Sequence, residues 1–226
     1  MNKEILDKFF NKTLENVYNE EMLNRGYVFP INEIKKYINE LCNISINEYI
    51  DYIISLNDVE QVLPKNIFQF SSFDDCTINL CNALIKNGDE GYRFDDIGRL
   101  LLNDGKERKI GALRKYGENA TKTASELGLI QIIENYSFLS CIGYAYPSLS
   151  EDIKQKITTR LILRSLFFVN LIRAARNDEY DIHWLLMSLG ESTQRRRISN
   201  IKFLIKYLKC DDSDELNRII DNVKFD

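Results

Sequence analysis

The stretch from residue 181 to residue 208 reads Asp-Ile-His-Trp-Leu-Leu-Met-Ser-Leu-Gly-Glu-Ser-Thr-Gln-Arg-Arg-Arg-Ile-Ser-Asn-Ile-Lys-Phe-Leu-Ile-Lys-Tyr-Leu. Apolar residues recur at helical spacing on both sides of Gly190, which predicts two short helices. We expect Asp181 and Ser192 to act as their N-caps. We expect Gly190 to end the first helix, because a sharp turn needs a residue that tolerates φ > 0. The pattern is typical of a helix-turn-helix.

The second predicted helix has two different faces. One face is apolar and would pack inward, with Ile198, Ile201, Ile205 and Leu208. The opposite face is basic and rich in hydrogen-bonding groups, which suits the major groove of DNA. A solvated helix surface is the alternative interpretation of three consecutive arginines. The predicted DNA-binding residues of this helix are Ser192, Thr193, Arg195, Arg196, Arg197, Ser199, Lys202 and Lys206.

The composition is that of an ordinary globular protein. Of the 226 residues, 44% are apolar and 28% are charged. No apolar run approaches the length of a membrane span, and the first residues alternate charged and apolar side chains, unlike a signal peptide. We therefore expect a cytoplasmic protein that does not enter a membrane.

Catalytic and metal-binding patterns are missing from the sequence. The five cysteines are not clustered and His183 is the only histidine, so no zinc pattern forms and the thiols are expected to be free. Glu33-Ile-Lys35 has the spacing of a nuclease motif, but it falls on a predicted helix. No phosphate-binding loop is found. We predict no catalytic residues, no metal and no cofactor, with a minimal nuclease that uses Glu33 and Lys35 as a minor alternative.

Positive charge is concentrated in the second half of the chain. The net charge is −4, and residues 1–90 carry 8 basic and 15 acidic side chains. Residues 99–122 instead carry seven basic and three acidic side chains, and residues 192–209 carry six basic side chains and no acid. Local basic segments are the electrostatic signature of a nucleic-acid partner.

The first 75 residues are predicted to form a winged-helix-like unit. Helical spacing covers residues 2–24 and 32–41, and Ser45 with Glu48 predicts a capping box at the start of a third helix. Two short strands, 59–63 and 66–70, would follow as a hairpin. The third helix is acidic, so we expect this unit to be a scaffold or a protein contact.

A second unit, residues 76–147, is predicted to repeat this layout after a linking helix over 72–88. Asp95 would cap a short helix, Gly117 would end a second helix over 106–116, and Gly128 would close a third. Two strands around Asn135 would form the wing. The predicted DNA-binding residues of the third helix are Lys115, Asn119, Lys122 and Ser125.

The third predicted unit, residues 148–226, begins with a long apolar helix over 153–172, capped by Ser148 or Ser150. This helix is expected to be a central packing helix, or alternatively a dimer interface. The helix-turn-helix and a last helix over 213–225 follow. The predicted fold is thus mainly α-helical with small β-wings, built of tandem winged-helix units over 1–75, 76–147 and 148–226.

Two stretches resemble a known group of proteins. Arg114-Lys-Tyr-Gly-Glu-Asn-Ala-Thr-Lys-Thr-Ala-Ser-Glu-Leu-Gly, with Ile142-Gly-Tyr-Ala-Tyr after the wing, and Leu189-Gly-Glu-Ser-Thr-Gln-Arg-Arg-Arg both carry the resemblance. They are similar to winged-helix DNA-binding modules of bacterial restriction and phage-defence proteins, over about residues 92–209. Phe203 stands where those modules usually have tryptophan. The resemblance implies a part of a larger system that reads or anchors DNA.

The sequence therefore predicts a non-catalytic protein that binds double-stranded DNA, as a regulator or recognition component of a bacterial restriction or antiviral defence system. The alternative is an adaptor built of tandem winged helices within a larger complex. A second subunit or a second copy of the chain would then bind through residues 153–172 or 1–75.

Overall fold

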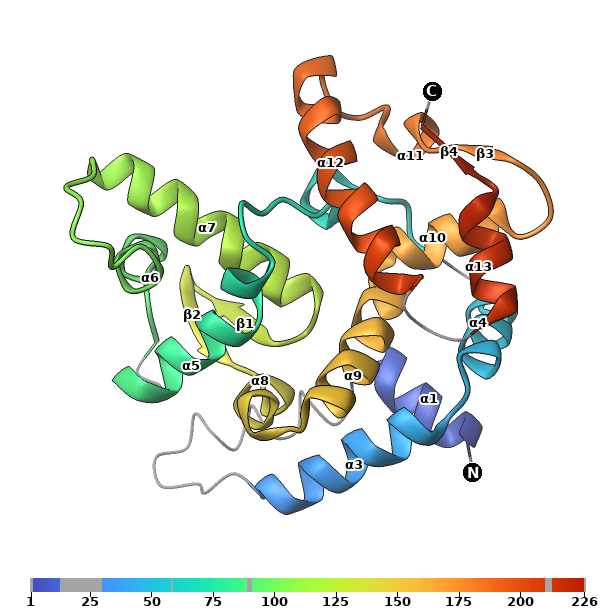
Figure 1. The fold of residues 1–226 in the computed structure, drawn as a ribbon, viewed down its shortest axis with the longest axis horizontal. Helices are drawn as coiled ribbons and strands as arrows, with labels where there is room; N and C mark the ends of the chain where they lie inside the picture. Colours follow the sequence, from blue (N-terminus) through green and yellow to red (C-terminus); the bar gives the residue numbers. More distant parts are fainter. Residues whose placement is uncertain (1, 13–29, 58, 89–90, 210–212, 226) are drawn as a thin grey trace. The chain divides into compact units, whose positions relative to one another are not determined.

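A computed structural model describes residues 2–12, 30–57, 59–88, 91–209 and 213–225 (Figure 1). The described part is mainly helical, with twelve α-helices and two short two-stranded sheets. The predicted fold class is confirmed at this level.

The chain divides into two compact units, each assembled from separate segments. Unit 1 comprises residues 1–10, 39–68 and 152–226, and unit 2 comprises residues 11–38 and 69–151. The chain passes between the units at 10/11, 38/39, 68/69 and 151/152. Unit 1 thus combines segments from both ends of the chain.

Unit 2 consists of helices followed by a hairpin. Its helices and strands are α5 (Ile78–Asn87), α6 (Phe94–Leu101), α7 (Ile110–Glu126), β1 (Ile130–Ile133), β2 (Tyr136–Leu139) and α8 (Cys141–Ala145), with 3₁₀ turns at Asp74–Cys76 and Tyr146–Ser148. The predicted linking helix is confirmed as α5. Asp95 is not the N-cap of α6: Arg93 holds that position, and Asp95 lies in the first turn.

The prediction that Gly117 breaks a helix is wrong, because α7 runs through it without interruption. A Cβ atom at Gly117 would lie 1.9 Å from the carbonyl oxygen of Phe94, and one at Gly98 would lie 2.1 Å from that of Leu113. Both distances are far below van der Waals contact. The two glycines therefore let α6 and α7 cross with their backbones in contact.

The end of α7 and the hairpin match the prediction. Gly128, at φ 76°, donates its N–H to Ser125, and the N–H of Leu129 bonds the carbonyl of Ala124, which is a Schellman motif. Strands β1 and β2 pair antiparallel, with Ile130 opposite Leu139. The two residues between them both have positive φ, 49° at Glu134 and 69° at Asn135, as a tight two-residue turn requires.

Unit 1 is built from α1 (Asn2–Phe10), α4 (Ile46–Ser55), α9 (Glu151–Arg164), α10 (Leu166–Ala175), α11 (His183–Leu186), α12 (Glu191–Leu208) and α13 (Asp214–Asp221). Helix α3 (Ile31–Asn43) crosses the division between the units. Two-residue strands β3 (Tyr180–Asp181) and β4 (Val223–Lys224) pair in parallel. The aromatic core includes Phe9, Tyr49, Phe68, Phe167 and Phe168, each at most 1% exposed.

The long apolar helix predicted over 153–172 is divided in two at Ser165. The Ser165 side chain accepts the backbone N–H of Phe168 as the N-cap of α10, and its own backbone is extended. The packing interpretation of this stretch is confirmed, because its apolar residues such as Leu161 and Phe167 are fully buried within the chain.

Three arginines on α9 and α10 bind the carboxyl ends of other helices of unit 1. Arg160, 3% exposed, donates to the carbonyls of Leu41, Cys42 and Ile44 at 2.9, 3.0 and 2.5 Å. Arg164 donates to the Phe9 carbonyl at 3.0 Å. Arg173 donates to carbonyls at the end of α4, those of Ile53, Ile54 and Leu56. Regular helical hydrogen bonding stops at these helix ends, and the guanidinium groups supply donors there, although the carbonyls of Leu41 and Ile53 also accept the N–H groups of Ile44 and Leu56.

The first predicted unit is only partly found. The capping box is confirmed: Ser45 accepts the N–H of Glu48 at 3.3 Å, and Glu48 accepts the N–H of Ser45 at 3.2 Å. The predicted strands 59–63 and 66–70 are wrong, since this segment has no strand and contains a 3₁₀ turn at Pro64–Asn66. Helix α1 ends at Phe10, and residues 13–24 of the predicted first helix lie outside the described residues.

The predicted helix-turn-helix needs correction. The helix before the turn, α11, has only four residues, and Asp181 lies in β3 rather than at an N-cap. Gly190 is the N-cap of α12 with φ −68°, so it neither has positive φ nor ends α11. Ser192 lies inside the first turn of α12 and does not cap it. The last predicted helix is confirmed as α13, with Ser213 as its cap.

Candidate nucleic-acid interface

The outer surface of α7 carries the residues predicted for the middle unit. Lys115 and Lys122 are exposed, and Asn119 and Ser125 are half-buried. The opposite side of α7 packs inward through Gly117, Ala120 and Ala124. Figure 1 shows α7 as the long green helix in front of the yellow hairpin.

Helix α7 is fixed in place by polar contacts as well as by its crossing with α6. The Tyr116 hydroxyl donates to Asp75 at 2.5 Å, and Thr123 donates to the carbonyl of Gln69 at 3.0 Å. Burial raises the pKa of Tyr116, and the bond to Asp75 raises it further, so the phenol stays protonated. The outer surface of α7 is therefore held rigidly.

Glu118 lies between the two lysines of this surface. It pairs with Lys115 at 3.2 Å and with Lys122 at 2.6 Å. Partial burial on its own would raise the pKa of Glu118, but the bonds and charges of Lys122 and Lys115 together hold it below its ordinary value. The two lysines thus share one carboxylate, and the middle of α7 presents a net charge of about +1.

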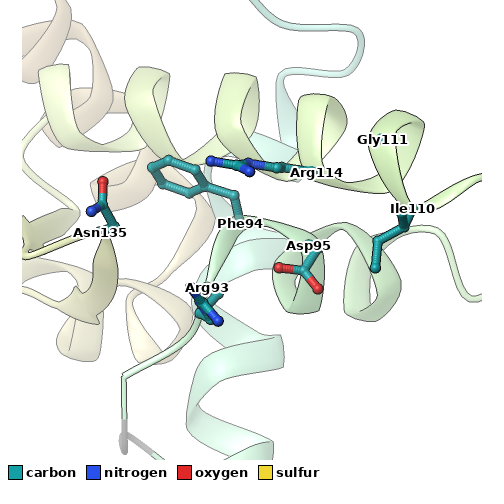
Figure 2. Close-up of a pocket in the computed structure, with 7 residues that line it drawn as sticks. All are labelled: Arg93, Phe94, Asp95, Ile110, Gly111, Arg114 and Asn135. Atoms are coloured by element: carbon teal, nitrogen blue, oxygen red, sulfur yellow. The ribbon is translucent and has the colours of Figure 1, made fainter.

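A groove of about 460 Å³ opens beside this surface (Figure 2). Arg93 and Asp95 line it from the start of α6, Ile110 and Arg114 line it from α7, and Asn135 lines it from the hairpin turn. Phe94 and Gly111 complete the lining. The groove therefore brings together the three elements of unit 2 that follow α5.

The two arginines of the groove are available to an anion. Arg93 and Arg114 are exposed, and neither forms an ion pair among the residues that the structure describes. Asp95, the acid of the groove, is bound by Arg99 at 3.2 Å. A guanidinium without a carboxylate partner is well suited to a phosphate oxygen, which it can bind through two N–H groups.

Helix α12 of unit 1 presents a second basic surface, which we call the α12 strip: Ser192, Arg195, Arg196, Ser199, Lys202, Phe203 and Lys206, all exposed. Arg195 forms no ion pair with the described residues, and Arg196 contacts only the hydroxyl of Thr193, at 3.4 Å. Lys202 lies 4.9 Å from the centre of the Phe225 ring.

Arg197 belongs to the interior rather than to the α12 strip. Its guanidinium donates to the carbonyl of Ile67 at 2.7 Å, and burial lowers its pKa from the ordinary value. Thr193 is half-buried. Of the three consecutive arginines, Arg195 and Arg196 thus point outward, whereas Arg197 binds the backbone of the segment that contains Ile67.

Sequence reasoning missed the groove. Arg114 belongs to a basic segment and to the first stretch that carries the resemblance, Asn135 belongs to a predicted turn, and no sequence pattern includes Arg93. The groove forms where α6, α7 and the hairpin turn meet, so its residues are far apart in sequence and share no spacing. A weak sequence signal for the groove is a basic residue directly before one helix, Arg93, and a second basic residue one turn inside the next helix, Arg114.

Other candidate sites have no support in the described residues. Glu33 and Lys35 lie on α3, as predicted, and no group of three His, Cys, Asp or Glu side chains gathers there or elsewhere in the described chain. His183 bonds Asp181 through Nδ1 at 2.7 Å. Cys42, Cys76, Cys81 and Cys141 are buried and form no disulfide among the described residues.

No helix in the described ranges is both long and apolar enough to span a bilayer. Comparison with protein-family models, with curated proteins and with solved structures finds no match for this chain.

Proposed function

We propose that unit 2 is a winged-helix module that binds double-stranded DNA with α7 as its recognition helix. The observation that carries this proposal is the groove between α6, α7 and the hairpin turn, whose two arginines form no ion pair with any residue that the structure describes. The order of the elements gives further support. An isolated antiparallel bridge joins Tyr92, between α5 and α6, to Ser137 of β2, so the segment before α6 pairs with the hairpin at one position. Three helices with such a sheet are the layout of a winged helix.

The dimensions of α7 fit the proposed role. With 17 residues it is about 25 Å long, at 1.5 Å of rise per residue. A helix of ordinary diameter enters the major groove of B-DNA, which is about 12 Å wide. Lys115, Asn119 and Lys122 lie about one turn apart on the exposed side and would face base edges or phosphates.

The charges of unit 2 predict different contributions to DNA binding from the groove and from the outer surface of α7. Arg93 and Arg114 carry full positive charges toward the groove and would bind phosphates of the DNA backbone. Lys115 and Lys122 are partly neutralised by Glu118, so they add less to affinity. We therefore expect the groove arginines to account for most of the salt dependence of binding.

The test is a titration of a fluorescein-labelled random duplex, read by anisotropy over a series of salt concentrations. Arg114→Ala is expected to reduce the slope of log K against log salt by about 0.9, and Arg93→Ala with Arg114→Ala by about 1.8, because each removes one phosphate contact. Lys86→Ala, an exposed lysine on α5 outside the groove, is the matched control and should leave the slope unchanged. Equal slopes for all four proteins would refute the assignment.

Contact of α12 with DNA stays a prediction from the sequence. The exposed cations of the α12 strip favour it, but the one-turn α11 does not provide the supporting helix that a helix-turn-helix places across the DNA backbone. A role within a bacterial restriction or phage-defence system also stays a prediction, which rests on the resemblance alone. If DNA binding is weak and vanishes with moderate salt, the adaptor alternative is favoured instead.

A further inference from the structure

Two large apolar side chains are exposed at α11: Trp184 lies in the helix and Met187 is its C-cap. Trp184 is 61% exposed and Met187 is 64% exposed, although most large apolar residues of the chain are buried. They are three residues apart, so they lie on one side of the helical turn. Figure 1 shows α11 in orange, joined by a short connection to the start of α12.

The packing of α11 does not require these two side chains. Ile182 and Leu186, both 0% exposed, bury the other side of the turn, and the N–H of Ile182 bonds the carbonyl of Lys224 at 3.0 Å. Segment 182–186 is thus held by its inner residues. A tryptophan and a methionine that are exposed together on a well-held turn mark a contact surface rather than a part of the core.

Positive charge lies close to this apolar pair. Glu191, the first residue of α12, is four positions after Met187, so the two residues are at most about 14 Å apart. The connection is short and fixed, because Gln194 donates its side-chain N–H to the carbonyl of Leu189 at 2.8 Å. Arg195 and Arg196 then point outward from the first turns of α12.

The residue types favour a protein as the occupant. Tryptophan, methionine and arginine are enriched in the centre of protein interfaces, where lysine and acidic residues are depleted. A DNA duplex offers no apolar pocket for Met187, whereas a protein segment can bury it together with Trp184. The acids of α12 are limited to Glu191, so carboxylates would complement the arginines.

We propose that α11 and the first turns of α12 bind a partner protein through a segment that carries apolar side chains flanked by Asp or Glu. The apolar side chains of the partner would cover Trp184 and Met187, and its carboxylates would pair with Arg195 and Arg196. This surface lies in unit 1, so the inference does not depend on DNA binding by unit 2.

The experiment uses the full chain, immobilised, and a displayed library of random peptides. Peptides are selected on the wild-type protein and counter-selected on a Trp184→Ser, Met187→Ser variant. The affinities of synthetic selected peptides are then measured for the wild type, for this variant and for an Arg195→Ala, Arg196→Ala variant. Leu63→Ser, which removes another exposed apolar residue of unit 1, is the matched control. Trp184 is the only tryptophan, so its emission reports contact directly.

We expect enriched peptides with apolar and acidic residues, which shift the Trp184 emission to shorter wavelength. Each double variant should weaken their binding about ten-fold or more, and Leu63→Ser should not. The substituted side chains are exposed, so circular dichroism should be unchanged.

Four results would overturn the proposal. The first is that no peptide is enriched, and the second is that selected peptides bind the Trp184→Ser, Met187→Ser variant as tightly as the wild type. The third is that a DNA duplex quenches Trp184 emission and that the Arg195→Ala, Arg196→Ala variant lowers the salt dependence of DNA binding. The fourth is that the chain self-associates and that the Trp184→Ser, Met187→Ser variant does not. The third result would identify DNA as the ligand of α12, and the fourth would identify a second copy of the chain as the occupant.

Discussion

Replacing Gly117 with alanine tests the close crossing of α6 and α7. The new Cβ atom would lie 1.9 Å from the backbone oxygen of Phe94, which cannot rotate away as a side chain would. Separating two packed helices is overpacking, at a cost of about 3 kcal/mol. Alanine is the better helix former by about 1 kcal/mol. We expect Gly117→Ala to lower the free energy of unfolding by about 2 kcal/mol.

Gly111 in the same helix is the matched control. It has ordinary helical φ, and a Cβ atom there would meet no other atom within 4 Å. Gly111→Ala should therefore raise the free energy of unfolding, by about 0.5–1 kcal/mol. The assay is urea unfolding followed by circular dichroism, with wild type and both variants measured side by side. If Gly117→Ala is as stable as Gly111→Ala, the backbone contact between the two helices is refuted.

Two further predictions concern unfolding and thiol reactivity. Arg160→Met should lower the free energy of unfolding by about 3 kcal/mol in the same urea assay, because it removes the guanidinium donors of the buried Cys42 and Ile44 carbonyls. Lys156→Ala, which removes an exposed ion pair one turn away, should change it by about 0.5 kcal/mol or less. Equal effects of the two substitutions would contradict the anchoring role of Arg160. Burial raises the pKa of Cys42 to about 11 and of Cys81 to about 12, so neither thiol forms much thiolate at pH 8. In a Cys210→Ser protein, we therefore expect the thiols to react slowly with a thiol reagent at pH 8 in the folded state and rapidly in urea. Fast labelling of the native protein at either thiol would show that it is not buried.

Features that depend on neighbouring residues could be predicted from the sequence. The capping box at Ser45 needs only Glu48, three residues on, and its two hydrogen bonds close within one turn. Gly128 ends α7 through bonds to residues three and five positions earlier. The hairpin that follows has its turn and its strands within ten residues. In each case the stabilising groups are local, so the pattern and the structure agree.

Features that depend on distant partners could not be predicted. Gly117 and Gly128 are the same residue type in similar surroundings, but one allows a helix crossing and the other a left-handed turn. The partner that decides the role of Gly117 is Phe94, more than twenty residues away. Segment 59–70 has the alternation of a hairpin, but its backbone bonds elsewhere: the carbonyl of Ile67 accepts a hydrogen bond from Arg197, 130 residues later, at 2.7 Å.

Arginine shows why a count of charges does not locate an interface. The sequence gives Arg160 the same positive charge as Arg114, yet the first is buried against helix ends and the second lines an open groove. Even the run from Arg195 to Arg197 is divided, because its last member turns inward to the carbonyl of Ile67. The guanidinium of Arg160 binds the carbonyls of Leu41, Lys156, Cys42 and Ile44, so it is not available to a phosphate or a carboxylate. Among the described residues, the exposed arginines with neither a carbonyl nor an acid as partner are Arg93 and Arg114 at the groove of unit 2 and Arg195 and Arg196 at the start of α12. Ligand binding is therefore best sought at these two surfaces, and the variants at Arg114 and at Arg195 with Arg196 separate them.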